Sequence, residues 1–313
     1  MQFEWPTPEQ MIYRATRLRR LVVLAVAIPV CVMLLTAIID PSFLSPNRAT
    51  LGAIAVALLI VGHVALFPNV TLETISLSLS LSLLVISMPW IKVLSGTVPA
   101  ENTSAAYAML VMFAVLCTGF LMWAVRGLLT ALAYAGPALS LRVTASADIA
   151  CSTGVAHRQF ALQPETRRGR ILCGPADSDG LFDVAIVAPQ VADPTAPDQP
   201  FVARVVARVL NSDENSHQVM LLLGDGSIAV TSQSFEETAE GCRVTVTEMP
   251  GDFTLGMHLM FWLADQQADN MTEIVDAIVS EPARANGLSH GVSFLSVAGA
   301  LLSPRDPAVK RAK

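Results

Sequence analysis

Four long apolar segments fill most of the first 125 residues, and they constrain the fold of this chain more than any other feature. None contains Asp, Glu, Lys or Arg, and they are Leu21–Ile39, Leu51–Phe67, Ile75–Ile91 and Ala105–Val125. At a rise of about 1.5 Å per residue, helices of about 17–21 residues roughly cross a hydrocarbon core of about 30 Å. Four such helices in succession would leave a soluble protein no amphipathic surface. We therefore predict a membrane domain of four transmembrane helices.

The charges divide the chain into two parts. Residues 1–136 carry seven basic and five acidic side chains, whereas residues 137–313 carry 13 basic and 21 acidic ones. The second part is long enough to bury a core of its own. Its acidity argues against nucleic acid as a partner, because phosphate binding needs a basic surface. The predicted division is an N-terminal segment (1–20), a membrane domain (21–136), a folded domain (137–280) and a C-terminal tail (281–313).

Basic residues gather at one end of the predicted spans. Only Arg48 and Lys92 lie in the loops on the side opposite the N-terminus. Cytoplasmic flanks of membrane proteins carry an excess of Lys and Arg, so this bias places both termini and the folded domain in the cytoplasm. The predicted location is the inner (plasma) membrane, spanned several times. The arginines on the N-terminal side are Arg14, Arg17, Arg19, Arg20, Arg126 and Arg142.

Two polar features stand out within the spans. His63 is the only readily ionisable side chain inside any of them, and an intramembrane His can relay protons or bind a metal. With no second His or carboxylate at helical spacing, packing is the favoured interpretation. The third span alternates Ser and Leu from Ser76 to Leu83, and small hydroxyl residues allow helices to approach closely. This pattern favours a packing seam, within the protein or with a partner, over a path for a solute.

Several common chemistries lack their sequence motifs. The five cysteines are widely spaced, with no CxxC and no Cys/His zinc pattern, which argues against a disulfide framework, haem attachment or structural zinc. The chain has no P-loop, GxGxxG, GxSxG or HExxH motif. No metal and no cofactor are expected, and a non-enzyme is favoured over an enzyme.

The folded domain has the pattern of an antiparallel meander. A predicted strand (Ala138–Ser146) and a predicted helix (Ala147–Leu162) come first, and a loop over Pro164–Gly180 follows. Turn residues such as Gly, Pro, Asp and Asn then separate short runs with strand-like composition. These runs are Leu181–Ala188, Phe201–Asn211, His217–Leu223, Ser227–Glu236 and Cys242–Met249.

The periodicity changes after Pro250. From Thr254 to Ser280 the apolar residues recur at the i, i+3, i+4, i+7 spacing of an amphipathic helix. This spacing predicts a single helix of about seven turns, which would bury its apolar stripe by packing across the sheet.

The order strand, helical insertion, antiparallel strands and long C-terminal helix over residues 138–280 resembles the START-like, or SRPBCC, superfamily with its helix-grip fold. One clear helix precedes the second strand here, where the family usually has two. The expected fold is thus a membrane all-α four-helix domain plus an α+β helix-grip domain, an antiparallel sheet wrapped on a long C-terminal helix.

The resemblance implies a cavity between sheet and helix that suits an apolar ligand such as a lipid, sterol, quinone or polyketide. It brings no catalytic residue that can be assigned here. Glu248 and His258 form an imaginable acid–base pair at the cavity mouth, with surface or capping roles as the alternative. Three methionines (Met257, Met260 and Met271) and Phe261 would suit the wall of a ligand cavity and a packed core equally well. The ligand-cavity candidates are Met257, Met260, Phe261, Met271, Glu248 and His258.

Arg167, Arg168 and Arg170 form the only basic cluster of the acidic domain up to residue 280. If they face the membrane they could contact lipid headgroups; an ordinary solvated loop is the alternative.

Three hypotheses about function follow from these features. In the first, a multi-pass membrane protein binds an apolar ligand, or a partner, through a cytoplasmic START-like domain at the membrane surface. In the second, it is a non-catalytic accessory or assembly subunit of a membrane complex. In the third, it is a cyclase- or hydrolase-type enzyme acting on a lipid-derived substrate. The expected partners are the lipid bilayer, an apolar small molecule and membrane-complex subunits.

Overall fold

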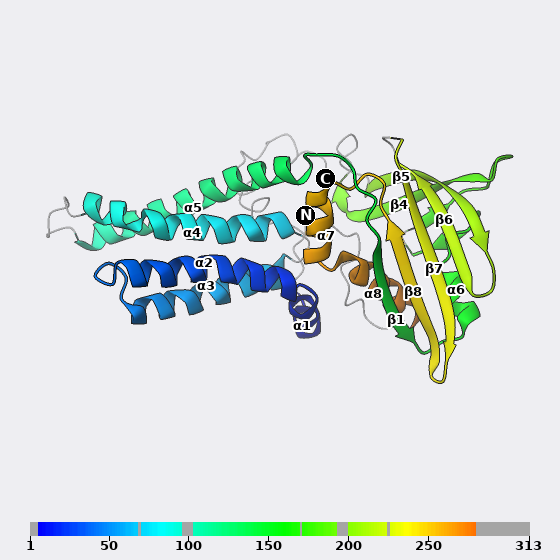
Figure 1. Ribbon diagram of the computed structural model, residues 1–313, viewed down its shortest axis with the longest axis horizontal. Helices are drawn as coiled ribbons and strands as arrows, with labels where there is room; N and C mark the ends of the chain where they lie inside the picture. The colour runs from blue at the N-terminus through cyan, green and yellow to red at the C-terminus, as the bar shows by residue number, and fades with distance from the viewer. Residues whose placement is uncertain are drawn as a thin grey trace, which may run out of the picture.

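The computed structural model describes residues 6–67, 70–95, 103–169, 171–192, 200–223 and 226–279. Helices α2 to α5 lie side by side along the long axis of the molecule, α7 lies across their ends, and an antiparallel sheet lies beyond it (Figure 1). The predicted tail 281–313 lies outside the described residues.

Helix α1 (Pro8–Arg17) begins at a capping box. The Gln10 backbone N–H donates to the Thr7 hydroxyl at 3.2 Å, and the Thr7 backbone N–H donates to the Gln10 side chain at 3.0 Å. Pro8 occupies the first helical position, where its missing N–H costs nothing. At the other end, the Arg14 guanidinium donates to the Ala65 carbonyl in the last turn of α3 at 2.7 Å. These contacts fix α1 across the end of the helical bundle.

The bundle consists of α2 (Arg19–Ile39), α3 (Pro46–Leu66), α4 (Thr71–Ser95) and α5 (Thr103–Ala133). By length and composition, three segments of the described chain could cross a membrane: Arg19–Ile39, Pro46–Leu66 and Met112–Ala133. The apolar part of α4, Thr71–Ser87, is shorter than these three segments. The helical N-terminal region is therefore as expected, and the fourth span remains a prediction.

The serines of α4 pack within the bundle. Ser76, Ser78, Ser80 and Ser82 are all buried, and the Ser78 hydroxyl donates to the Ala25 carbonyl of α2 at 2.6 Å. This interhelical hydrogen bond requires close approach of α2 and α4, which the small side chains permit. The predicted packing seam is confirmed, and it lies inside the protein.

The described strands form one eight-stranded sheet in the order β1-β8-β7-β6-β5-β4-β3-β2, with every neighbouring pair antiparallel. The meander β4 to β8 follows the predicted runs closely. β1 pairs with β8, so the first and last strands of the domain lie together. The bounds are β1 Val143–Ile149, β2 Arg167–Arg168, β3 Ile171–Cys173, β4 Leu181–Ala192, β5 Pro200–Ser212, β6 Ser216–Leu222, β7 Ile228–Thr238 and β8 Gly241–Met249.

One face of the sheet, called here the inner face, is covered by α6 (Thr153–Phe160) and α8 (Gln266–Ile278). The core between them consists of alternating inward side chains of the strands and apolar side chains of the two helices. Its buried members include Phe160 of α6, Phe235 of β7, Val244 of β8 and Met271 of α8. A second cluster around Phe182 continues the core across β4, β5 and β6.

The prediction of one long helix over 254–280 is wrong. The segment forms two helices, α7 (Leu255–Leu263) and α8, which meet at Asp265 in a left-handed backbone conformation with φ of 47°. Asp tolerates this conformation better than most side chains because its short polar group bonds locally. Of these two helices, α8 packs on the sheet, whereas α7 packs against the ends of α4 and α5.

The bundle and the sheet domain share a joint around α7. Leu263 and Ala264 are buried against Leu18, Leu21 and Val64 of the bundle. The backbone of Gly256 lies so close to the end of α5 that an added Cβ would be 2.5 Å from the Ala133 Cα. Tight packing therefore joins the two parts.

Candidate functional site

A cavity of about 290 Å³ lies between the inner face of the sheet and α8. Three groups of elements form its wall: the end of α6 with the following hairpin, the strands β4, β6, β7 and β8, and one face of α8. The residues that line the cavity include Phe160, Arg168, Gln233, Val246, Glu248, Gln267, Met271 and Ile274.

Most of the cavity surface is apolar. Phe160, Val246 and Met271 are buried core residues that also face the cavity, and Ile274 lies one helical turn beyond Met271. The volume is at the lower end of the roughly 300–1,000 Å³ typical of ligand pockets. It therefore suits a compact or single-chain ligand.

One part of the wall is polar. The Glu248 carboxyl, from the end of β8, is hydrogen-bonded with the Gln267 side chain of α8, and burial raises the pKa of Glu248. The amide oxygens of Gln233 and Gln267 are buried and have no hydrogen-bond partner among the described residues. Buried acceptors without partners are uncommon, because each costs desolvation free energy. This polar end is ready to receive hydrogen-bond donors from a ligand.

The three arginines of the predicted membrane-surface cluster lie in different settings. Arg167 is exposed, and Arg170 lies outside the described residues. Arg168 lines the cavity, and its guanidinium donates to the Gln159 carbonyl at 2.6 Å and to the Phe160 carbonyl. Burial lowers the pKa of Arg168 to about 10. Its Nη1 group thus caps the C-terminal end of α6.

The predicted cavity residues divide between two places. Glu248 and Met271 line the cavity under the sheet, whereas Met257, Met260 and Phe261 line a second pocket beside α7. His258 lines neither, and its Nε2 donates to the Leu139 carbonyl at 2.6 Å. The structure therefore does not bring Glu248 and His258 together as an acid–base pair. The break at Asp265 separates these residues, since it turns α7 away from the sheet.

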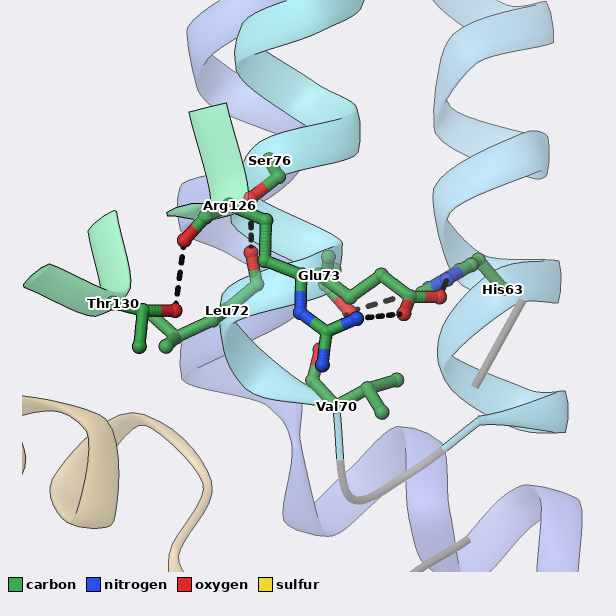
Figure 2. A network of polar contacts seen from close by, with 8 residues as sticks. His63, Val70, Leu72, Glu73, Ser76, Arg126 and Thr130 are labelled. Carbon is green, nitrogen blue, oxygen red and sulfur yellow. Dashed lines mark hydrogen bonds and ion pairs between the residues drawn. The ribbon is translucent and has the colours of Figure 1, made fainter. Parts of the chain in front are cut away.

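A buried polar network joins three bundle helices at the end nearest the sheet domain (Figure 2). The Glu73 carboxylate of α4 is fully buried, with one oxygen 3.2 Å from His63 Nε2 of α3 and the other 3.5 Å from Arg126 Nη1 of α5. The Thr74 hydroxyl lies 3.2 Å from His63 Nδ1. His63 thus has the carboxylate partner that sequence reasoning missed. Glu73 lies two residues before the predicted span, so a search at helical spacing within one span could not find it.

Among the described residues, no three His, Cys, Asp or Glu side chains lie close enough together to bind a metal ion.

Comparisons with known proteins found solved structures that are similar to part of this chain. No family model matches the chain, and no curated protein matches it. Among solved structures, a Mesorhizobium loti protein is 9% identical with a TM-score of 0.31, covering 45% of this chain and 97% of its own. A Bordetella parapertussis protein is 15% identical with a TM-score of 0.33, covering 48% of this chain and 81% of its own. A polyketide-cyclase-like protein of Corynebacterium glutamicum is 15% identical with a TM-score of 0.27, covering 45% and 89%.

The class of the C-terminal region follows from its own topology. β1 lies beside β8, the remaining strands follow in antiparallel order to β2, and α8 packs across the inner face above a cavity. This arrangement is that of a helix-grip fold, as the order of elements predicted. The chain therefore joins a bundle with apolar helices of membrane-spanning length to a helix-grip domain with a cavity under its sheet.

Proposed function

We propose that this chain is a multi-pass protein of the inner membrane, with four spans and both termini in the cytoplasm, whose START-like domain binds an amphiphilic small molecule. The ligand has a compact or single-chain apolar body and a head that donates hydrogen bonds. The fourth span and the orientation rest on the charge-free segment Ile75–Ile91 and on the arginine bias.

The observation that carries the binding proposal is the polar end of an otherwise apolar cavity. Phe160, Val246, Met271 and Ile274 offer surface to an apolar body, and Gln233 and Gln267 offer two buried acceptors. A carboxyl with a raised pKa, as in Glu248, is more easily kept neutral and avoids burying a charge beside an apolar ligand. The volume of about 290 Å³ supports a single-chain rather than a two-chain lipid.

A cavity-filling substitution tests this proposal. Native mass spectrometry of the full-length protein in detergent should detect a bound small molecule, and a fluorescent single-chain fatty alcohol, whose hydroxyl can donate to the two glutamine oxygens, should compete for its site. Ile274→Trp fills the cavity and should abolish both signals. Leu210→Trp, on an exposed position of β5, is the matched control and should leave both unchanged. Equal binding by the two variants, or an empty wild-type protein that does not bind the fatty alcohol, contradicts the proposal.

Catalysis in the same cavity is less well supported than binding. Glu248 has the raised pKa expected of a general acid, and the Arg168 Nη1 group donates to the carbonyls at the end of α6. The largely apolar wall around Glu248, Glu273 and Arg168 favours retention of a ligand over its conversion.

A second candidate function is that of an accessory subunit in a membrane complex. The observation that favours it is a stripe of exposed apolar side chains on α7: Leu255, Leu259 and Trp262 are 65%, 54% and 54% exposed. Mass photometry of wild type and of Leu259→Ser, purified from the native membrane, distinguishes the two functions. A stoichiometric assembly lost in Leu259→Ser supports the subunit role, and a protein of unchanged mass supports the ligand-binding role alone.

A further inference from the structure

A second pocket, of about 540 Å³, lies where the bundle meets α7. The start of α4 and the end of α5 form one side of it, and α7 with its flanking residues forms the other. The side chains that matter are Glu73, Arg126, Tyr134, Phe253, Met257, Met260 and Phe261. The pocket lies at the level where the apolar segments of α4 and α5 end.

The two sides of this pocket differ in chemistry. Met257, Met260 and the edge-to-face pair Phe253 and Phe261, with ring centroids 5.5 Å apart, form an apolar side. Arg126 forms the cationic side, and its side chain is 41% exposed. A ligand that fills both sides must combine an apolar part with a group that accepts hydrogen bonds from a guanidinium.

Arg126 is held in a way that leaves donors available. Its contact with Glu73 uses Nη1 at 3.5 Å, and no other hydrogen bond from the guanidinium is found among the described residues (Figure 2). A guanidinium has five N–H donors. Glu73 has a second partner in His63, so its buried carboxylate stays hydrogen-bonded when Arg126 turns towards a ligand.

We propose that this pocket binds the anionic headgroup of a membrane lipid, with Arg126 on the phosphate and the apolar side of α7 against the upper acyl chains. The α5 surface next to it is largely uncovered, with Leu128 and Leu132 each 60% exposed, so lipid chains can run along the helix. Basic pockets between helices at a membrane surface recognise anionic headgroups in this manner. The inference rests on the proposed membrane placement of the helices, but not on a ligand in the cavity under the sheet.

The test compares two phospholipids with identical acyl chains. Full-length protein in detergent is titrated with phosphatidylglycerol or phosphatidylcholine and followed by native mass spectrometry, with inorganic phosphate as a third probe. Wild type should prefer phosphatidylglycerol. Arg126→Gln should lose roughly fivefold in affinity for it, and Arg126→Lys should retain most of the preference. Arg48→Gln removes the same charge from an exposed position away from the pocket and should behave like wild type.

Arg126→Gln could also weaken the bundle, because it removes a partner of Glu73. Met260→Trp therefore provides an independent variant, since it fills the apolar side without touching the ion pair and should lower binding of both lipids. Equal wild-type binding of the two lipids, equal losses in Arg126→Gln and Arg48→Gln, or full competition by inorganic phosphate overturns the proposal. Because the cavity under the sheet is unaltered in all these variants, fatty-alcohol binding there reports separately on the proposed function.

Discussion

Three of the acidic side chains that pack inside the protein, Glu73, Asp269 and Glu248, differ in what lies beside them. Glu73 lies against His63 and Arg126, and Asp269 of α8 lies 2.8 Å from the Arg17 guanidinium. Glu248 is hydrogen-bonded with Gln267, whose amide carries no charge, and burial therefore raises its pKa. Burial also raises the pKa of the Tyr13 phenol, and the neighbouring Asp269 raises it further. A charged partner thus distinguishes Glu73 and Asp269 from Glu248.

Replacing Glu248 with Gln should change how stability depends on pH. Because the folded pKa of Glu248 is raised, the folded state holds this proton at pH values where the unfolded chain, with a pKa of about 4.3, has lost it. The wild-type free energy of unfolding therefore falls as the pH rises through that window and stays lower at neutral pH. Glu248→Gln has no such loss and should be the more stable protein at neutral pH, with little difference in acid.

Thermal unfolding midpoints of the full-length protein, from about pH 4 to about pH 8, measure this difference. Glu240→Gln, at an exposed turn position, is the control and should follow the wild-type curve. Parallel curves for wild type and Glu248→Gln would show that the carboxyl is solvated in the folded protein.

At the scale of elements, local sequence patterns predicted most of the fold. The strands β4 to β8 match the predicted runs because alternation and turn residues are local signals. The short strands β2 and β3, which lie within the predicted loop Pro164–Gly180, and the break at Asp265 were missed for physical reasons. β2 exists only through its pairing with β3, which no local pattern reveals. The apolar spacing of 254–280 continues unchanged past Asp265, so it gives no sign of the left-handed residue that breaks the helix. The predicted helix Ala147–Leu162 is shorter, since Val143–Ile149 pairs with β8 instead.

The packing of α7 against α5 leads to a prediction about Gly256. In a helix, replacing Gly with Ala usually stabilises a protein by up to about 1 kcal/mol. Here the new Cβ would lie 2.5 Å from Ala133 Cα and 2.7 Å from its carbonyl oxygen, both of them backbone atoms. Gly256→Ala should instead destabilise by roughly 1–3 kcal/mol and move α7 away from α5.

Gly154→Ala in α6 is the matched control, because nothing lies within 4 Å of its added Cβ. Thermal unfolding should show a lower midpoint for Gly256→Ala only, and hydrogen exchange should show faster exchange in α7. A Gly256→Ala protein as stable as the control would mean that α7 does not pack closely on α5.

At the scale of the whole molecule, sequence patterns assigned the candidate cavity residues to the correct domain, but they did not predict which of these residues lie close together. Glu248 and Met271 do share the cavity, whereas Met257 and Met260 belong to the pocket at the joint. The contacts between the two parts join residues far apart in the chain, such as Tyr13 and Asp269. Periodicity within one segment carries no information about such pairs, so the joint and its pocket could not be predicted.

The buried ion pair between Arg17 and Asp269 is the strongest polar link between α1 and the helix that closes the cavity. The side chains are 3% and 0% exposed, and the Tyr13 hydroxyl donates to the other Asp269 oxygen at 2.9 Å. Asp269→Ala should therefore destabilise the protein by about 3–5 kcal/mol, because it leaves a buried guanidinium without its counter-charge. Hydrogen exchange in α1 and α8 should rise together.

The double variant Arg17→Met with Asp269→Leu separates the cost of a lone buried charge from the value of the pair. Apolar side chains of similar volume often replace a buried ion pair with little loss, so the double variant should be more stable than Asp269→Ala. Asp148→Ala removes an exposed ion pair of the same 2.8 Å length, with Arg243, and should change stability little. If Asp269→Ala were as mild as Asp148→Ala, water would have to reach Arg17, and α1 would not be fixed on α8. In that case α8, the helix that closes the cavity, could move independently of α1 and the bundle.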